Sequence, residues 1–124
     1  MSQKKILIAE DSSVIQNLAK RVLSFQNFDI QIAKNGQKVL DMLQKEAFDV
    51  ILLDINMPVM DGVECVKQIR ALDDTQKAKT PVIAITGNAK NYTMEEFKAM
   101  GIDEYIPKPI NFDILIETVR KFTS

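Results

Sequence analysis

The sequence contains no histidine among its 124 residues, and this absence excludes several kinds of active site. A Ser-His-Asp triad and a Cys-His pair both need an imidazole as base, and many metal centres use it as a ligand. Any chemistry must therefore rest on carboxylates, hydroxyls and lysine. The single cysteine, Cys65, stands inside a helical pattern, so we expect a small packing residue and not a reactive thiol.

The chain also lacks a long apolar run and an excess of charge of either sign. No stretch approaches the roughly 18 residues of a membrane span, and residues 1–5 lead into a short strand, not into a signal-peptide core. The 16 basic and 17 acidic residues give a net charge of −1. We therefore expect a cytoplasmic protein without membrane insertion or nucleic-acid binding.

Short apolar runs separated by helical patterns indicate the fold. Val50–Leu53 is an unbroken apolar run, typical of a strand buried on both faces of a parallel sheet. The alternating run at Asp29–Ala33 favours an edge strand. The complete set of predicted strands is Lys5–Ala9, Asp29–Ala33, Val50–Asp54, Pro81–Thr86 and Glu104–Pro107.

Five helices are expected between and after these strands. Ser12 or Ser13 can cap the first, where Ser13 and Gln16 fit a capping box, and a second box pairs Thr93 with Glu96. The third helix is expected to begin near Val63 and to fray at residues 73–75. Asn35 and Asn111 are further predicted N-caps, and Gly101 is a predicted C-terminal cap. The predicted apolar faces are Val14, Ile15, Leu18, Ala19, Val22, Leu23 and Phe25 on the first helix and Ile114, Leu115, Val119 and Phe122 on the last.

This alternation predicts one α/β domain over residues 1–124. We expect a doubly wound, five-stranded parallel sheet of order 2-1-3-4-5, flavodoxin-like in topology, with five helices and right-handed crossovers. No linker, repeat or low-complexity segment is left over.

Polar residues stand where the predicted strands end. Glu10 and Asp11 follow the first strand, Asp54 ends the third, Thr86 ends the fourth and Lys108 follows the fifth. Each has a simple structural explanation, because acidic residues cap helices and lysines are usually solvated. Open parallel sheets, however, bind ligands at these carboxyl ends, where the first and third strands are neighbours. Asp49, at the opposite end of the third strand, is therefore not a candidate.

The three carboxylates of Glu10, Asp11 and Asp54 are expected to converge and to need a counter-ion. Oxygen ligands without histidine or cysteine select a hard cation, Mg²⁺ or Mn²⁺. Because Mg²⁺ sites in proteins often include a phosphate oxygen, we expect this site to receive a phosphoryl group. Asp54 could act as nucleophile, while Thr86 and Lys108 could contact phosphoryl oxygens.

At this point the residues support a resemblance. Glu10-Asp11, the Asp54 strand, the segment Met57–Gly62, Thr86-Gly87 and Lys108-Pro109 together resemble the receiver domain of two-component response regulators, the CheY-like family. The resemblance covers nearly the whole chain, from about residue 5 to residue 122. Each motif alone is weak, but five in order at these spacings are specific.

The resemblance implies a role for each of these residues. Asp54 would be the phosphoacceptor, and the Asn56 backbone carbonyl would join Glu10 and Asp11 as a metal ligand. Thr86 and Lys108 would contact the phosphoryl group, and Tyr105 would be a switch aromatic that turns inward as Thr86 moves. An amphipathic strand explains Tyr105 equally well. The family also implies a cis peptide bond before Pro109, and a phosphoryl lifetime influenced by positions 56 and 88.

By the same resemblance the chain is a switch and not an enzyme with an external substrate. The donor would be a phosphohistidine of a histidine kinase or histidine phosphotransfer protein. A downstream target protein would read residues 90–105 and 111–122. Met94, Phe97 and Met100 could form part of that surface, although Met and Phe in helices are more often core residues. The chain could be a stand-alone protein or part of a hybrid kinase, and either a monomer or a dimer formed on phosphorylation.

Three other functions remain as alternatives. A haloacid-dehalogenase-like phosphohydrolase also uses a strand-end Asp, a Thr and a Lys, but carries a second Asp where this chain has Asn56. A flavodoxin-like flavin carrier needs a Ser/Thr-rich phosphate loop where this chain has Glu10 and Asp11. A degenerate receiver acting as a scaffold is less well supported, because no key residue type is missing.

Overall fold

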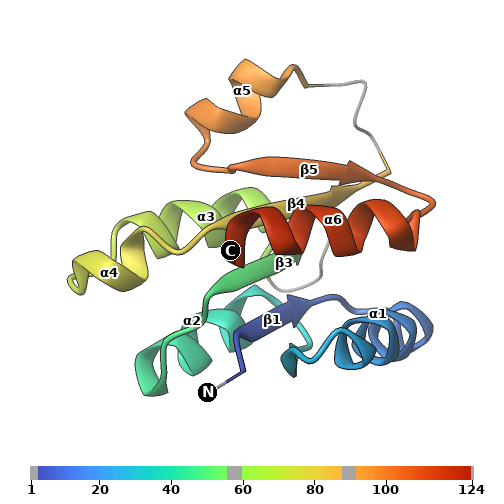
Figure 1. The fold of residues 1–124 in the computed structure, drawn as a ribbon. Coiled ribbons are helices and arrows are strands. Elements are labelled where there is room, and N and C mark those ends of the chain that lie inside the picture. The colour runs from blue at the N-terminus through green and yellow to red at the C-terminus, as the bar shows by residue number, and fades with distance from the viewer. Residues whose placement is uncertain (1–2, 56–59, 88–91, 124) are drawn as a thin grey trace.

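The computed structural model describes residues 3–55, 60–87 and 92–123. Its centre is a five-stranded, all-parallel sheet in the order β2-β1-β3-β4-β5 (Figure 1). The α/β class, the parallel sheet and the strand order are therefore confirmed. The strands are β1 (Lys5–Ala9), β2 (Asp29–Ala33), β3 (Val50–Asp54), β4 (Val82–Thr86) and β5 (Glu104–Pro107).

Helices cover both faces of the sheet (Figure 1). On β1, Ile6 and Ile8 pack into the cluster that contains α1 and α6, whereas Leu7 and Ala9 pack on the opposite side with α2, α3 and α5. Among the described residues, no helix combines the length and apolar character needed to cross a membrane. The helices of these two layers are α1 (Ser13–Phe25), α6 (Phe112–Thr123), α2 (Gly36–Lys45), α3 (Gly62–Arg70) and α5 (Met94–Ala99).

The interior strands explain the unbroken apolar runs in the sequence. Every residue of β3 and of β4 is buried, because helices cover both faces, whereas the edge strand β2 is mostly half-buried. Burying one Leu or Ile side chain contributes about 1.5–3 kcal/mol. Cys65 is also buried, and burial raises the pKa of its thiol to about 12, which agrees with the packing role expected for it.

A sixth helix lies within the described part of the chain and was not predicted. The sequence analysis expected the third helix to fray at residues 73–75, but α4 (Thr75–Ala78) forms there. The Asp74 carboxylate caps it by accepting hydrogen bonds from the amides of Gln76 and Lys77, at 3.0 and 3.2 Å. A four-residue helix is too short to show an apolar period, so its cap was the available signal.

The predicted helix caps are partly confirmed. Thr93 and Glu96 form the expected capping box, with both hydrogen bonds at 3.1 Å, and Gly101 follows α5 with a φ of +95°. The capping box of Ser13 with Gln16 was wrong. Ser12 is the N-cap, and the Gln16 side chain donates instead to the backbone carbonyl of Glu10.

The predicted apolar faces of α1 and α6 were wrong at four positions. The side chains of Val14, Leu18 and Phe25 on α1 are 66%, 44% and 83% exposed, and Ile114 on α6 is 46% exposed. A short helix contacts the sheet along a narrow stripe, which Ala19 and Leu23 supply on α1. The other apolar side chains are left on the surface of the α1/α6 layer.

Candidate functional site

The predicted site residues lie at the carboxyl edge of the sheet, each on a different strand end. Glu10 follows β1, Asp54 ends β3, Thr86 ends β4 and Lys108 follows β5. The registers Ala9↔Leu53, Asp54↔Ile85 and Thr86↔Pro107 bring these ends to one level of the sheet. Since β1 and β3 are neighbours, this edge is the topological switch point where open α/β sheets bind ligands.

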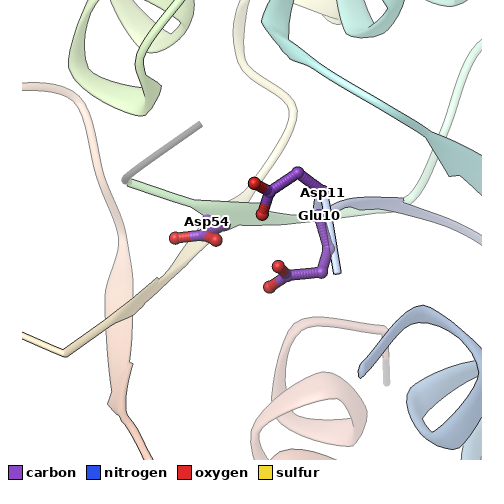
Figure 2. Close-up of side chains that lie close together, drawn as sticks. All are labelled: Glu10, Asp11 and Asp54. Carbon is purple, nitrogen blue, oxygen red and sulfur yellow. The ribbon is translucent and has the colours of Figure 1, made fainter. Parts of the chain in front are cut away.

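Three carboxylates meet at this edge. Ligand oxygens of Glu10, Asp11 and Asp54 all lie within 4.8 Å of one another. Figure 2 shows the Asp54 side chain, from β3, beside the two acidic side chains of the segment after β1. Glu10 and Asp54 are each 1% exposed, whereas Asp11 is exposed. The cluster therefore combines two buried acceptors with one that solvent can reach.

Backbone contacts hold Glu10 in place and leave one of its oxygens without a donor. The Glu10 amide donates to the Ala33 carbonyl at 3.2 Å, and the Ser12 amide donates to Glu10 Oε1 at 3.1 Å. Glu10 Oε2 is buried and has no hydrogen-bond partner among the described residues. The Lys108 ammonium lies 3.9 Å from this atom, which is too far for a hydrogen bond. Since a buried carboxylate oxygen without a hydrogen bond is costly, the atom favours a proton or a bound cation.

The protonation of Glu10 reflects this environment. Burial raises the pKa of Glu10 to about 7, and the neighbouring charge of Asp54 also raises it, while the Ser12 amide and the Lys108 ammonium act in the opposite direction. Near neutral pH, a proton and a cation would therefore compete for the same oxygen. The donor set, which is carboxylate oxygen alone, fits a hard divalent ion.

A lysine closes the other side of Asp54. Lys108 Nζ lies 3.1 Å from Asp54 Oδ2 and 3.9 Å from Glu10 Oε2. Its backbone amide donates to the Thr86 carbonyl at 2.8 Å, which fixes the start of the β5–α6 loop against β4. The Lys108–Pro109 peptide bond is cis, as the resemblance implied. Thr86 itself is buried, at 1% exposure.

Two glycines border the site for different reasons. Gly62 donates from its amide to the Ile55 carbonyl at 2.8 Å, and a Cβ there would lie 2.7 Å from Ile55 Cα and 2.9 Å from the Asp54 carbonyl. A Cβ at Gly87 would meet no heavy atom within 4 Å. Packing therefore requires glycine at position 62 but not at position 87.

The predicted switch aromatic belongs to a stack of rings. Tyr105 is half-buried, and its ring centroid lies 5.1 Å from that of Phe97, with an angle of 29° between the ring planes. The ring centroid of Tyr92 lies 5.3 Å from that of Phe97. Phe97 is 1% exposed, so of the two roles considered for it the core role is confirmed and the place in an exposed surface was wrong. Met94 and Met100 are half-buried.

Some predicted positions cannot be compared with the structure, and two contributors were missed. Asn56, Asn88 and the first residues of the predicted target surface, at 90–91, lie outside the described residues. Sequence reasoning did not find the contact of the Ser12 amide with the Glu10 carboxylate, nor that of the Gln16 side chain with the Glu10 carbonyl. A polar residue in the first turn of a helix that follows a strand-end carboxylate would have been the signal.

The fold and the site define a doubly wound α/β domain with a cluster of three carboxylates and a lysine at its switch point. The chain belongs to the response regulator receiver domain family, whose model matches residues 6–120. This confirms the resemblance to CheY-like receivers, and the phosphohydrolase and flavin-carrier alternatives fall away.

Several relatives of this chain are larger signalling proteins that match it over part of their length. Over 125 residues the chain is 37% identical to hybrid signal transduction histidine kinase I of Dictyostelium discoideum, covering 97% of this chain and 7% of that protein. Over 116 residues it is 32% identical to the transcriptional regulatory protein CpxR of Escherichia coli, covering 94% of this chain and 47% of that protein. The chain therefore spans less than half the length of either relative.

Solved structures show the same fold. Chemotaxis response regulator CheY4 of Vibrio cholerae is 32% identical and superimposes with a TM-score of 0.87, over 98% of this chain and 99% of that chain. The receiver domain of the sensor histidine kinase PA1611 from Pseudomonas aeruginosa is 26% identical, with a TM-score of 0.87 over 99% and 100% of the two chains. In that structure a magnesium ion is coordinated in the active-site cleft.

Proposed function

We propose that this chain is a phosphorylation-activated switch of a two-component or phosphorelay system, with Asp54 as the phosphoacceptor. The supporting observation is that the Asp54 carboxylate contacts the Lys108 ammonium group and belongs to one cluster with the carboxylates of Glu10 and Asp11. An aspartate beside a potential cation site and a lysine ammonium group suits an aspartyl-phosphate intermediate. The chain would catalyse only the formation and hydrolysis of its own phosphoaspartate.

Glu10, Asp11 and Asp54 would hold the metal ion. Magnesium fits best, manganese shares its ligand preference, and the unsatisfied Oε2 atom of Glu10 supports a cation here. The ion would reduce the repulsion between the Asp54 carboxylate and an incoming phosphoryl group. The Asn56 carbonyl stays a predicted fourth ligand.

The transfer step assigns separate tasks to the side chains around Asp54. An Asp54 carboxylate oxygen would form a bond to phosphorus while the bond from phosphorus to the donor imidazole nitrogen breaks and its electron pair returns to that nitrogen. Lys108 and Thr86 would each contact a phosphoryl oxygen, by charge and by a hydroxyl hydrogen bond respectively. Tyr105 would respond as Thr86 moves.

The donor phosphohistidine must lie outside these 124 residues, because they contain no histidine. A histidine kinase or a histidine phosphotransfer protein would supply it. An apolar cavity of about 240 Å³ between α1 and the β5–α6 loop supports an approach over α1, since Lys108 lines it and also contacts Asp54. The lining residues are Ile15, Leu18, Lys108, Pro109, Ile110 and Phe112.

The target protein, the phosphorylation-dependent dimer and the cytoplasmic location stay predictions.

Intact mass after incubation with acetyl phosphate tests the proposed function. Wild type is expected to gain one phosphoryl group only when Mg²⁺ is present, and Asp54→Asn is expected to gain none while keeping its fold. Asp49→Asn, at the opposite end of β3, is the matched control and should react like wild type. Uptake by Asp54→Asn at the wild-type rate would show that another residue is the acceptor.

A further inference from the structure

The Gln16 side chain ties the acidic segment after β1 to the first turn of α1. Its Nε2 group donates to the Glu10 carbonyl, and its backbone amide donates to the Ser12 carbonyl at 2.9 Å. Ser12 in turn donates from its amide to Glu10 Oε1 at 3.1 Å and accepts from the Ile15 amide. Residues 10–12 are thus held to the helix by backbone and side-chain contacts together.

The Glu10 carbonyl needs this donor because it lies beyond the strand ladder. The last registered pair that joins β1 to β3 is Ala9 with Leu53, and Glu10 is 1% exposed. Of the described residues, Gln16 supplies the hydrogen bond to this carbonyl. A buried carbonyl without a donor costs about 1–3 kcal/mol, so loss of the Gln16 amide would favour a different backbone path through residues 10–12.

The path of this segment determines where two of the three carboxylates point. Asp11 is exposed, so packing does not fix its side chain, and its place within 4.8 Å of Glu10 and Asp54 depends on the backbone that carries it. The Glu10 carboxylate belongs to the same cluster, and its Oε2 atom accepts no hydrogen bond from the described residues. Both carboxylates therefore depend on a backbone that Gln16 holds.

We propose that Gln16 is a positioning residue for the cation site, acting through the Glu10 carbonyl and not by touching the ion. The inference rests on the proposed function, in which the acidic cluster binds Mg²⁺. Glutamine suits the position because its amide donates without charge. Lysine or arginine would place a positive charge beside the ion, and glutamate would add a carboxylate that cannot donate to a carbonyl when ionised.

Mg²⁺ titration followed by backbone amide spectra tests the proposal. Gln16→Met keeps the length of the side chain and removes the donor, and Asn17→Met makes a comparable change one residue further on, at an exposed position. The Mg²⁺ dissociation constant of Gln16→Met is expected to rise about tenfold, the lower end of the effect seen when supporting partners of metal ligands are lost. Asn17→Met is expected to stay within about twofold of wild type.

A second variant separates positioning from stability. Gln16→Arg retains a donor, and at high ionic strength, where its charge is screened, its dissociation constant should lie closer to wild type than that of Gln16→Met. Melting temperatures without metal are measured in parallel, because a merely structural role would lower stability without changing Mg²⁺ affinity in the variants that remain folded. This arm remains informative if Gln16→Met does not fold.

The possible failures can be told apart. If wild type bound no Mg²⁺, the proposed cation site itself would be wrong. If wild type bound Mg²⁺ and gained its phosphoryl adduct, but folded Gln16→Met bound the ion within about twofold of wild type, the positioning role would be overturned and the proposed function would stand. Equal weakening in Gln16→Met and Asn17→Met would also overturn it, since the effect would then not depend on the Glu10 carbonyl.

Discussion

The ammonium group of Lys108 faces two buried carboxylates at once, lying 3.1 Å from Asp54 Oδ2 and 3.9 Å from Glu10 Oε2. The two acidic residues belong to the ends of neighbouring strands, whereas the lysine comes from the far side of β4. A phosphoryl group on Asp54 would enter this arrangement and give the lysine a new anionic partner. Under the proposed function, Lys108 would respond to phosphorylation of Asp54.

Replacing Lys108 with alanine is expected to separate phosphorylation from its consequence. Lys108→Ala should still form the phosphoryl adduct, more slowly, because the metal site and Asp54 remain. The amide shifts that follow phosphorylation in wild type should largely disappear, since the link from the phosphoryl group to the β5–α6 loop is lost. Lys98→Ala, an exposed change on α5, is the control. Shifts of equal size in wild type and Lys108→Ala would contradict this role.

The raised pKa of Glu10 predicts how stability depends on pH in the metal-free protein. Between the ordinary value of 4.5 and about 7, folded Glu10 holds a proton that the unfolded chain releases. This group therefore stabilises the fold below about pH 4.5, and its contribution is lost as pH rises to 7. The loss amounts to roughly 3–4 kcal/mol, at about 1.4 kcal/mol per pKa unit.

Urea unfolding with a chelator present measures this effect. Because other carboxylates also titrate, the quantity to follow is the difference in unfolding free energy between wild type and Glu10→Gln. That difference should shift against wild type as the pH rises from 4.5 to 7.5. A difference that stays constant across this range would mean that Glu10 titrates at its ordinary value.

Replacing each of the two glycines that border the site with alanine should change the free energy of unfolding by different amounts. At Gly62 the new Cβ would contact backbone atoms of Ile55 and Asp54 at under 3 Å, so Gly62→Ala is expected to cost about 1–3 kcal/mol. At Gly87 the Cβ meets open space, so Gly87→Ala should change stability by less than about 0.5 kcal/mol. Urea midpoints compare the two, and equal losses would contradict the distinction.

Much of the site could be predicted because strand ends are marked in the sequence. Buried runs in a parallel sheet are nearly continuous, so each stops visibly at its polar residue, as at Asp54 and Thr86. Strand order then determines that Glu10 lies beside Asp54. Four residues far apart in sequence could thus be placed at one edge without any knowledge of their side-chain positions.

The wrong predictions concern helix faces, a helix cap and the burial of Phe97. In each case the local sequence pattern is compatible with two different structures, and contacts with other segments decide between them. Periodicity placed Val14 and Phe25 on an apolar face, but it does not tell which apolar positions the neighbouring layer covers. Gln16 satisfied the spacing of a capping box with Ser13, but Ser12 is the N-cap, so Ile15 stands at the third helical position and the Gln16 amide donates to the Glu10 carbonyl. The burial of Phe97 depends on Tyr92 and Tyr105 in other segments.

The sheet also separates two core clusters, which have no residue in common among those that the structure describes. The exposed apolar residues Val14, Leu18 and Phe25 lie on the α1/α6 layer, whereas the ring stack around Tyr105 lies on the α5 side. A protein bound over α1 would leave the α5 side uncovered. The predicted target surface spans both layers, because residues 111–122 belong to α6 and residues 92–105 lie on or next to α5. While a phosphodonor occupied α1, the α5 part of that surface would stay open to a target protein.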